Sequence, residues 1–106
     1  MRKIFWKAEA LRMKRAIQID ERDNVATVTS DVRAGGVVEV LSPEARVIGR
    51  PRVSKDVPFG HKIALTGLER GEEIIKYGEA IGVATVSIEE GAWVHTHNVE
   101  SVRVPT

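Results

Sequence analysis

The 106-residue chain contains no cysteine. This absence excludes a disulfide framework, a thiolate zinc site, an iron–sulfur cluster and a cysteine nucleophile. Aromatic residues are also scarce, at 5% of the chain, and they are scattered along it. Because single-stranded nucleic acid is bound largely by stacking its bases on grouped aromatic side chains, we expect no nucleic-acid partner.

Long apolar runs are missing as well. The longest hydrophobic stretches span only a few residues, and no charged segment leads into an apolar run and a small-residue cleavage site. We therefore expect no membrane contact, no secretory signal and a cytoplasmic location. At 42% hydrophobic and 29% charged residues, the composition is that of one folded domain. A domain this small often depends on a partner, and a homo-oligomer is compatible with this size.

Familiar catalytic motifs are absent too. The chain has no P-loop, no GxGxxG, no nucleophile elbow and no pair of carboxylates spaced for acid–base catalysis. We therefore expect the chain to be catalytically inactive by itself.

Charge is distributed unevenly along the chain. Residues 1–15 carry a net charge of +5 and the rest carries −4. Within this basic head, Ile4, Ala8 and Leu11 recur at helical spacing, which predicts a short amphipathic helix. Two interpretations stay open: the helix docks on the body or a partner, or the natural protein begins at Met13, which we favour. We accordingly divide the chain into a head, 1–15, and a domain, 16–106.

From residue 16 onward the apolar pattern changes to a period of two, which is typical of β-strands. Prolines and glycines between residues 42 and 60 predict a loop with one or two short extended pieces. The strands that we expect cover residues 16–19, 25–29, 37–41, 62–66, 73–77, 81–86, 93–97 and 99–104.

One short pattern occurs three times. An apolar residue, two further residues and a glycine stand at 32–35, 68–71 and 88–91, each before an extended segment. The apolar residue would anchor the turn and the glycine would adopt a left-handed conformation. We therefore predict a compact β fold with tight corners.

The histidines are the strongest candidates for chemistry. His61 stands where a loop meets a strand, and on a strand the imidazoles of His95 and His97 would project from one face. Such a group suits a divalent metal or a polar substrate, although surface or structural histidines explain the same spacing. An arginine-rich loop could clamp an anion or form a solvated edge; its members are Arg46, Arg50 and Arg52.

Several ordered motifs resemble the SAF domain of the altronate and galactarate dehydratase family. They are Asp23-Asn24-Val25-Ala26, Gly60-His61-Lys62, Lys76-Tyr77-Gly78, Ile81-Gly82 and His95-Thr96-His97-Asn98. The resemblance covers roughly residues 16–104 and implies a mainly β, β-clip-like fold of short strands. Residues 45–56 show no clear family motif.

The resemblance also implies a function. It is that of a small subunit or amino-terminal domain of a hydro-lyase that removes a β substituent from a sugar acid or sulfolactate, giving a 2-keto acid. The implied partner is a large subunit or carboxyl-terminal catalytic domain, and the implied cofactor is a divalent metal, iron in particular. A non-catalytic SAF module for carbohydrate binding or assembly is the alternative.

The resemblance assigns roles residue by residue and leaves the catalytic base undetermined. The metal ligands that it implies are His61, His95 and His97. The substrate contacts that it implies are His61, Lys62, Lys76, Tyr77, Gly78 and Asn98.

Overall fold

The computed structural model describes residues 13–102, and this range contains nine β-strands and no helix. The prediction of a mainly β fold is confirmed. The helix expected over residues 1–15 is wrong at Lys14 and Arg15, which belong to the first strand; residues 1–12 lie outside the described range. None of the described residues forms a helix with the length and apolarity needed to cross a membrane.

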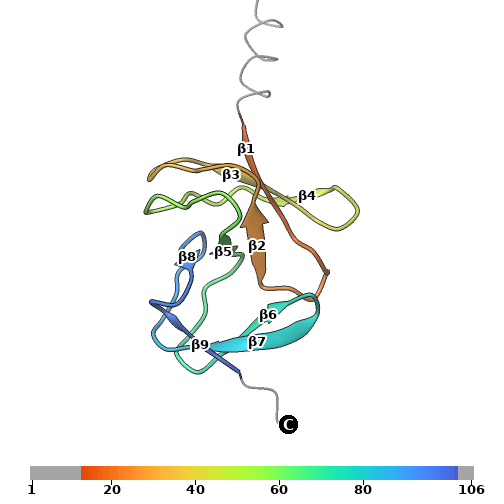
Figure 1. Ribbon diagram of the computed structural model, residues 1–106. Coiled ribbons are helices and arrows are strands. Elements are labelled where there is room, and N and C mark those ends of the chain that lie inside the picture. Colours follow the sequence, from red (N-terminus) through yellow and green to blue (C-terminus); the bar gives the residue numbers. More distant parts are fainter. Residues whose placement is uncertain (1–12, 103–106) are drawn as a thin grey trace, which may run out of the picture.

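Six strands form the larger sheet, in the spatial order β4-β3-β1-β2-β5-β8. Strands β1 and β3 run parallel, and the other neighbours run antiparallel. Figure 1 shows β3 and β4 crossing one end of the molecule and β2 and β5 running down from them. Their bounds are β1 Lys14–Ile17, β2 Val25–Val28, β3 Val38–Leu41, β4 Val47–Gly49, β5 Lys62–Ala64 and β8 Trp93–Val94.

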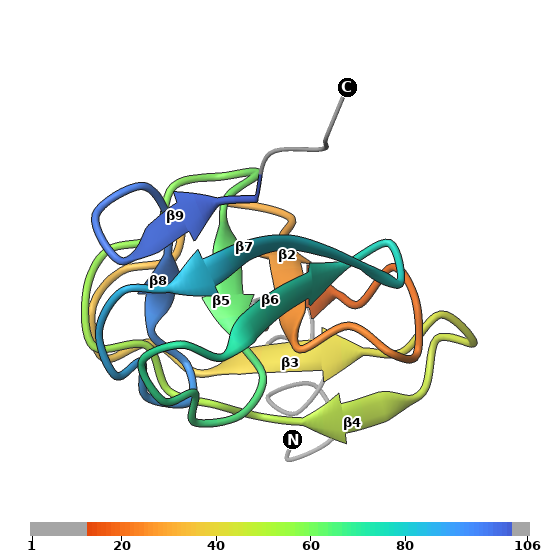
Figure 2. The same cartoon turned by 90° about the horizontal axis from the view of Figure 1, so that it is seen from below.

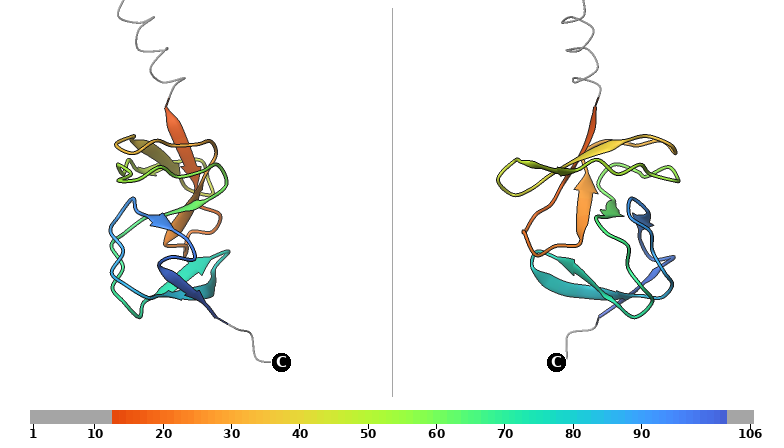
Figure 3. Two further views of the ribbon diagram at one scale, coloured as in Figure 1. Left: turned by 60° about the vertical axis from the view of Figure 1, so that its left-hand side comes forward. Right: turned by 180° about the vertical axis from the view of Figure 1, so that it is seen from behind.

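The remaining three strands form a smaller antiparallel sheet in the order β6-β7-β9. The bounds are β6 Glu73–Lys76, β7 Glu79–Ala84 and β9 Val99–Ser101. This sheet lies at the other end of the molecule, as Figures 1 and 3 show, and it comes to the front when the molecule is seen from below in Figure 2. Residues 13–102 therefore form two sheets, which lie toward opposite ends of the body.

The buried apolar side chains form two clusters, and the larger sheet contributes to both. In β3, Val38 and Val40 are buried while Glu39 and Leu41 are partly exposed, as expected for a strand with one face in the core. The first core cluster belongs to the larger sheet, and the second joins β2, β5 and β8 to the smaller sheet through Ile74 and Ala84. Burial of a valine or isoleucine side chain stabilises the fold by about 1.5–3 kcal/mol.

The three predicted corners are confirmed. Val32, Leu68 and Ile88 are buried, and the glycines that follow have φ angles of 86°, 93° and 82°. Leu68 and Ile88 also pair with each other through two backbone hydrogen bonds of 2.7 and 2.8 Å. The corners at 68–71 and 88–91 are therefore joined to each other, and in the sequence they flank strands β6 and β7.

Candidate functional site

Three imidazoles gather around one indole. The ring centroids of His61 and His95 are 4.6 Å apart, and Trp93 lies 5.5 Å from each of them. The planes of Trp93 and His95 are stacked at 8°, and the His97 ring lies 5.0 Å from the indole. We call these four residues the histidine cluster.

The pairing of β5 with β8 builds this cluster. Ile63 stands directly opposite Trp93 in this antiparallel pair. The residue before β5, His61, and the residue after β8, His95, therefore lie at the same end of the pair. A turn holds His61 there, because its N–H donates to the Pro58 carbonyl at 3.0 Å. The backbone pairing thus explains why motifs more than thirty residues apart meet.

The segment from His95 to Asn98 is a turn, so the strand expected over 93–97 ends at Val94. The side chain of Asn98 explains the early end. Its Oδ1 accepts the His95 backbone N–H at 2.9 Å, and its Nδ2 donates to the Trp93 carbonyl at 2.8 Å. Such local bonds to the backbone replace strand pairing. The imidazoles therefore meet through a turn, not through alternation along a strand.

Burial and neighbouring charges favour a neutral His95. Burial lowers the pKa of His95 from its ordinary value of 6.5, and the charges of His61, Lys62 and His97 lower it further. The pKa of Lys62 is also lowered, first by burial and then by the charge of Lys76. Lys62 thus lies within electrostatic range of both His95 and Lys76, and it links two of the motifs.

Trp93 completes the cluster and was not among the residues expected there. Its Nε1–H donates to Nδ1 of His61 at 3.1 Å. The available signal in the sequence was its position two residues before His95 in the same segment. A tryptophan preceding a strand end is more often a core residue, and Trp93 does pack partly against the first core cluster.

The Lys76-Tyr77-Gly78 motif forms the two-residue turn between β6 and β7. Lys76 pairs with Glu79, and Tyr77 and Gly78 have φ angles of 57° and 72°. Two successive positive φ angles are typical of a type I′ hairpin turn, which disfavours a residue such as tyrosine. The Tyr77 ring is exposed, and Nζ of Lys76 lies 5.0 Å from its centroid.

Two polar residues, the buried Asp23 and the partly exposed Asn24, hold this hairpin against the larger sheet; we call them the clasp. Oδ1 of Asp23 accepts the Gly78 N–H at 2.8 Å. Oδ1 of Asn24 accepts the Ile75 N–H at 2.8 Å, and its Nδ2 donates to the Glu73 carbonyl at 2.8 Å. The carboxamide of Asn24 therefore bonds to the edge of β6 as a neighbouring strand would.

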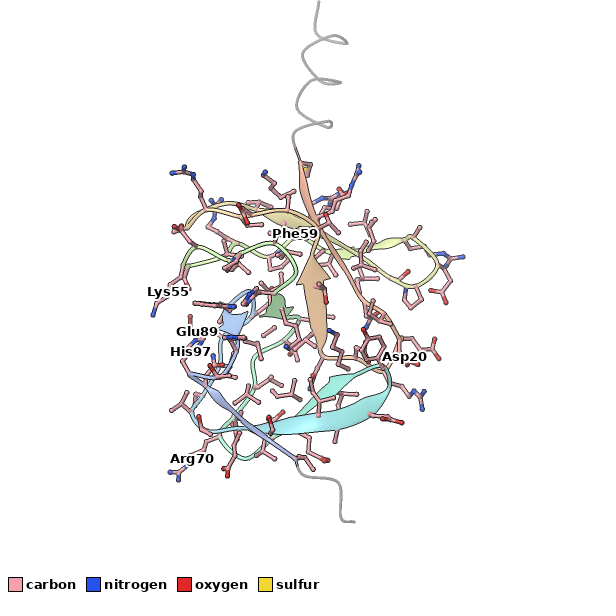
Figure 4. All side chains as sticks on the ribbon, viewed as in Figure 1. Asp20, Lys55, Phe59, Arg70, Glu89 and His97 are labelled. Carbon is pink, nitrogen blue, oxygen red and sulfur yellow. The ribbon has the colours of Figure 1, made fainter. Side chains whose placement is uncertain are left out.

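The predicted site residues divide into two places. His61, His95 and His97 meet. Gly78 instead bonds to Asp23 of the clasp, which directly follows Arg22 of the Asp20–Arg22 ion pair. Figure 4 shows Asp20 and His97 on opposite sides of the molecule. Asn98 is buried, and both of its polar side-chain atoms bond to the backbone of its own turn.

The arginine-rich loop does not bring its guanidinium groups together on an anion site. Arg50 pairs with Glu39 at 3.4 Å, and Arg52 donates to the Gly35 carbonyl. Arg46 is exposed at the other end of the loop. These contacts fit the interpretation of a solvated edge.

A pocket of about 330 Å³ opens beside the clasp, and its lining includes Gln18, Asp23, Ile48 and Leu65 but no histidine. Across residues 13–102, no group of three or more histidine, aspartate, glutamate or cysteine side chains is placed to hold a metal ion. Metal binding by the implied ligands His61, His95 and His97 stays a prediction.

Comparison with known proteins adds independent information. Residues 14–102 match the family model described as the altronate/galactarate dehydratase SAF domain. The chain is 38% identical over 85 residues to altronate dehydratase of Escherichia coli K12, a match that covers 80% of this chain and 16% of that protein. It is 34% identical over 78 residues to galactarate dehydratase (L-threo-forming) of the same organism, covering 74% of this chain and 14% of that protein.

A shorter relative matches as well. The chain is 48% identical over 48 residues to the alpha subunit of (2R)-sulfolactate sulfo-lyase of Paracoccus pantotrophus, which covers 45% of this chain and 72% of that subunit. The chain thus spans about one sixth of the altronate dehydratase that it matches and most of a separate small subunit.

Proposed function

The chain belongs to the altronate/galactarate dehydratase SAF-domain family, and we propose that it is the SAF part of a lyase that acts with a larger catalytic chain. The proposed reaction is β-elimination from a sugar acid or from sulfolactate, giving a 2-keto acid. The observation that carries the proposal is the histidine cluster, because two motifs distant in sequence, Gly60-His61-Lys62 and His95-Thr96-His97-Asn98, meet there.

The charges beside the cluster suit an anionic substrate. Lys62 lies within electrostatic range of His95 and Lys76, and its partial burial reduces screening by solvent. A carboxylate or sulfonate entering this region would be attracted by lysine ammonium groups and accept hydrogen bonds from them. The chain's first contribution is therefore to bind and orient a hydroxy acid.

The lowered pKa of His95 supports a second contribution. At neutral pH its imidazole is uncharged, so one ring nitrogen has a free lone pair. β-Elimination requires removal of the proton next to the carboxylate, and a neutral imidazole near substrate is suited to accept a proton. We assign this proton acceptor to His95.

A divalent metal, iron by family resemblance, is part of the proposal and would stabilise the enediolate charge. His97 is the residue of this chain that would bind it, because the one free lone pair of His95 is assigned to the substrate proton. Because the described residues do not form a three-ligand group, the remaining ligands are proposed to come from the larger chain. No step above depends on the metal.

The larger partner is proposed from the lengths of the related proteins. The two dehydratases are roughly six to seven times longer than the segment that matches, whereas the sulfo-lyase relative is a subunit. We propose that this chain, by itself, is inactive, that it works in cytoplasmic carbohydrate or hydroxy-acid metabolism, and that its small-molecule substrate binds where it meets the larger chain.

Co-expression tests the proposal. The chain is produced with the dehydratase-like chain encoded beside it, and 2-keto acid formation is measured with altronate, galactarate and sulfolactate. The complex should act on one of these substrates, and each chain alone should not. Equal activity of the larger chain without this one would contradict the subunit role.

The pocket beside the clasp favours one alternative, a non-catalytic module that binds carbohydrate. Its lining combines Gln18 and Asp23 with the apolar Ile48 and Leu65, a mixture that suits a polyol. Substitution of His95 and His97 by alanine would then leave the complex fully active. Substitution of Ile48 by glutamate, at the pocket wall, would instead weaken carbohydrate binding.

A further inference from the structure

We propose that Trp93 is a positioning residue that fixes which nitrogen of His61 carries the proton, so that His61 presents an Nε2–H donor to substrate. The substrate part of this inference rests on the proposed function. The part about the proton rests on the geometry of this chain alone.

The hydrogen bond between Trp93 and His61 can run in only one direction. An indole Nε1–H is a donor and never an acceptor. At 3.1 Å from the indole nitrogen, Nδ1 of His61 must therefore accept, which requires a lone pair at Nδ1. The neutral imidazole then carries its single proton on Nε2.

Trp93 is held firmly enough to impose this choice. Its backbone pairs with Ile63 across β5 and β8, and its carbonyl accepts from Asn98 at 2.8 Å. One ring face stacks against His95, while the residue packs partly against the first core cluster. The direction of the indole N–H is thus set by the fold, independently of His61.

The consequence is a division of roles within the cluster. A neutral imidazole with its proton on Nε2 can donate to a carboxylate or hydroxyl oxygen but has no lone pair there for a metal ion. Metal-binding histidines usually show the reverse pattern, in which the second nitrogen donates to a carboxylate or carbonyl. His61 is therefore a hydrogen-bond donor to substrate, and the roles that need a free lone pair fall to His95 and His97.

The first experiment measures the protonated nitrogen directly. Long-range ¹H–¹⁵N correlation spectra of the full chain at pH 8 should show a protonated Nε2 and an unprotonated Nδ1 for His61. In W93F, which retains a stacked ring but loses the donor, the Nδ1-protonated form should appear. W6F, which leaves Trp93 as the single tryptophan of the sequence, is the parent protein for an exchange measurement.

A wild-type His61 with the proton on Nδ1, or a spectrum unchanged by W93F, overturns the proposal. If W93F fails to fold, the wild-type spectrum still decides, and the Trp93 indole proton supplies a second measure. That proton should exchange slowly with solvent in W6F and faster in H61A/W6F. Equal exchange in both proteins would count against the bond.

The second experiment tests the link to substrate in the assembled enzyme. H61Q retains a donor at the Nε2 position and has no Nδ1, whereas H61N retains an acceptor at the Nδ1 position and lacks the Nε2 donor. W93F should raise KM by roughly fivefold to tenfold in the wild-type background, the usual effect of one hydrogen bond, and should have no further effect in H61Q.

A purely structural role for Trp93 predicts a different pattern. W93F would then raise KM by the same factor in the wild-type and H61Q backgrounds, which would overturn the positioning role. An assembled wild-type complex without lyase activity would instead contradict the proposed function, and the NMR result on His61 would stand independently.

Discussion

Asn24 and Asn98 make the same kinds of contact at two ends of this molecule. Each carboxamide accepts one backbone N–H and donates to one backbone carbonyl at 2.8–2.9 Å. Asn24 reaches residues 49 and 51 positions away in the other sheet, whereas Asn98 reaches residues 3 and 5 positions away in its own turn. The first contact joins two sheets, and the second shapes one loop.

The comparison separates stability from function. At the clasp, the carboxylate of Asp23 is buried and accepts two backbone N–H groups, so its polar atoms are satisfied within the protein. At the histidine cluster, His97 is exposed, and burial and nearby positive charge lower the pKa of His95. We therefore expect substitutions at the clasp to affect folding and those at the cluster to affect activity.

Asn24→Ala tests the contact that joins the two sheets. This change leaves the Ile75 N–H and the Glu73 carbonyl without their partner, so the free energy of unfolding should fall by about 1–3 kcal/mol. Asn98→Ala is the matched variant and should cost about half as much, because its bonds are local. Urea denaturation of both variants measures the difference, and equal losses would contradict the distinction between the two contacts.

Gly91 and Gly71 offer the next test. Both have positive φ angles, but a Cβ at Gly91 would lie 2.5 Å from the Arg52 carbonyl oxygen, whereas a Cβ at Gly71 would meet no atom within 4 Å. Gly71→Ala should therefore cost about 1–2 kcal/mol from backbone strain alone. Gly91→Ala should cost about 1–3 kcal/mol more.

Thermal and urea unfolding of the two alanine variants, measured side by side, check this ranking. A smaller loss for Gly91→Ala than for Gly71→Ala would contradict the close contact between Gly91 and the Arg52 carbonyl.

Tyr77→Asn should stabilise the protein slightly. Asparagine adopts the left-handed conformation more readily than tyrosine, and Asn-Gly is the preferred pair in a type I′ turn. We expect the free energy of unfolding to rise by about 0.5–1 kcal/mol while substrate binding weakens. Urea denaturation and KM of the complex measure the two effects; a stabilised variant with unchanged KM would remove Tyr77 from the site.

The smallest effect concerns protonation. Positive charge on Lys62 lowers the pKa of His95, so Lys62→Gln should raise the pKa of His95 toward 6.5. His95 in the wild-type chain should accordingly become protonated only as the pH falls below 6.5. NMR titration of the His95 ring follows both proteins. A pKa of His95 that falls in Lys62→Gln would show that the sign of this interaction is wrong.

Much of the fold could be predicted from the sequence because β-branched residues alternate along most strands. The expected strand over residues 25–29 corresponds to β2, and the three corners place their glycines as expected. The ends of the strands were predicted less accurately. The expected strand over 62–66 stops at Ala64, and β7 begins at Glu79 rather than at residue 81. The end of β8 at Val94 is set by the side-chain bonds of Asn98 to the backbone, which alternation alone does not reveal.

The candidate site was predictable in part. Motif order indicated His61, His95 and His97, but the reason that they meet is the β5–β8 pairing, a long-range contact. The roles of Trp93 and Asn24 could not be read from residue type. A tryptophan near a strand usually packs in the core, and an asparagine in a turn usually shapes a loop. Only their hydrogen-bond partners identify the first as the donor proposed to set a tautomer and the second as a link between sheets.

The most direct test of the central claim is an activity measurement on the assembled complex with three variants of one turn. His95→Ala and His97→Ala should each lower kcat/KM, His95→Ala by about 100-fold or more, which is the usual contribution of a positioned acid or base. Thr96→Ala, exposed between them, should retain nearly full activity, and all three should unfold at similar urea concentrations. Full activity in both histidine variants would contradict a functional histidine cluster.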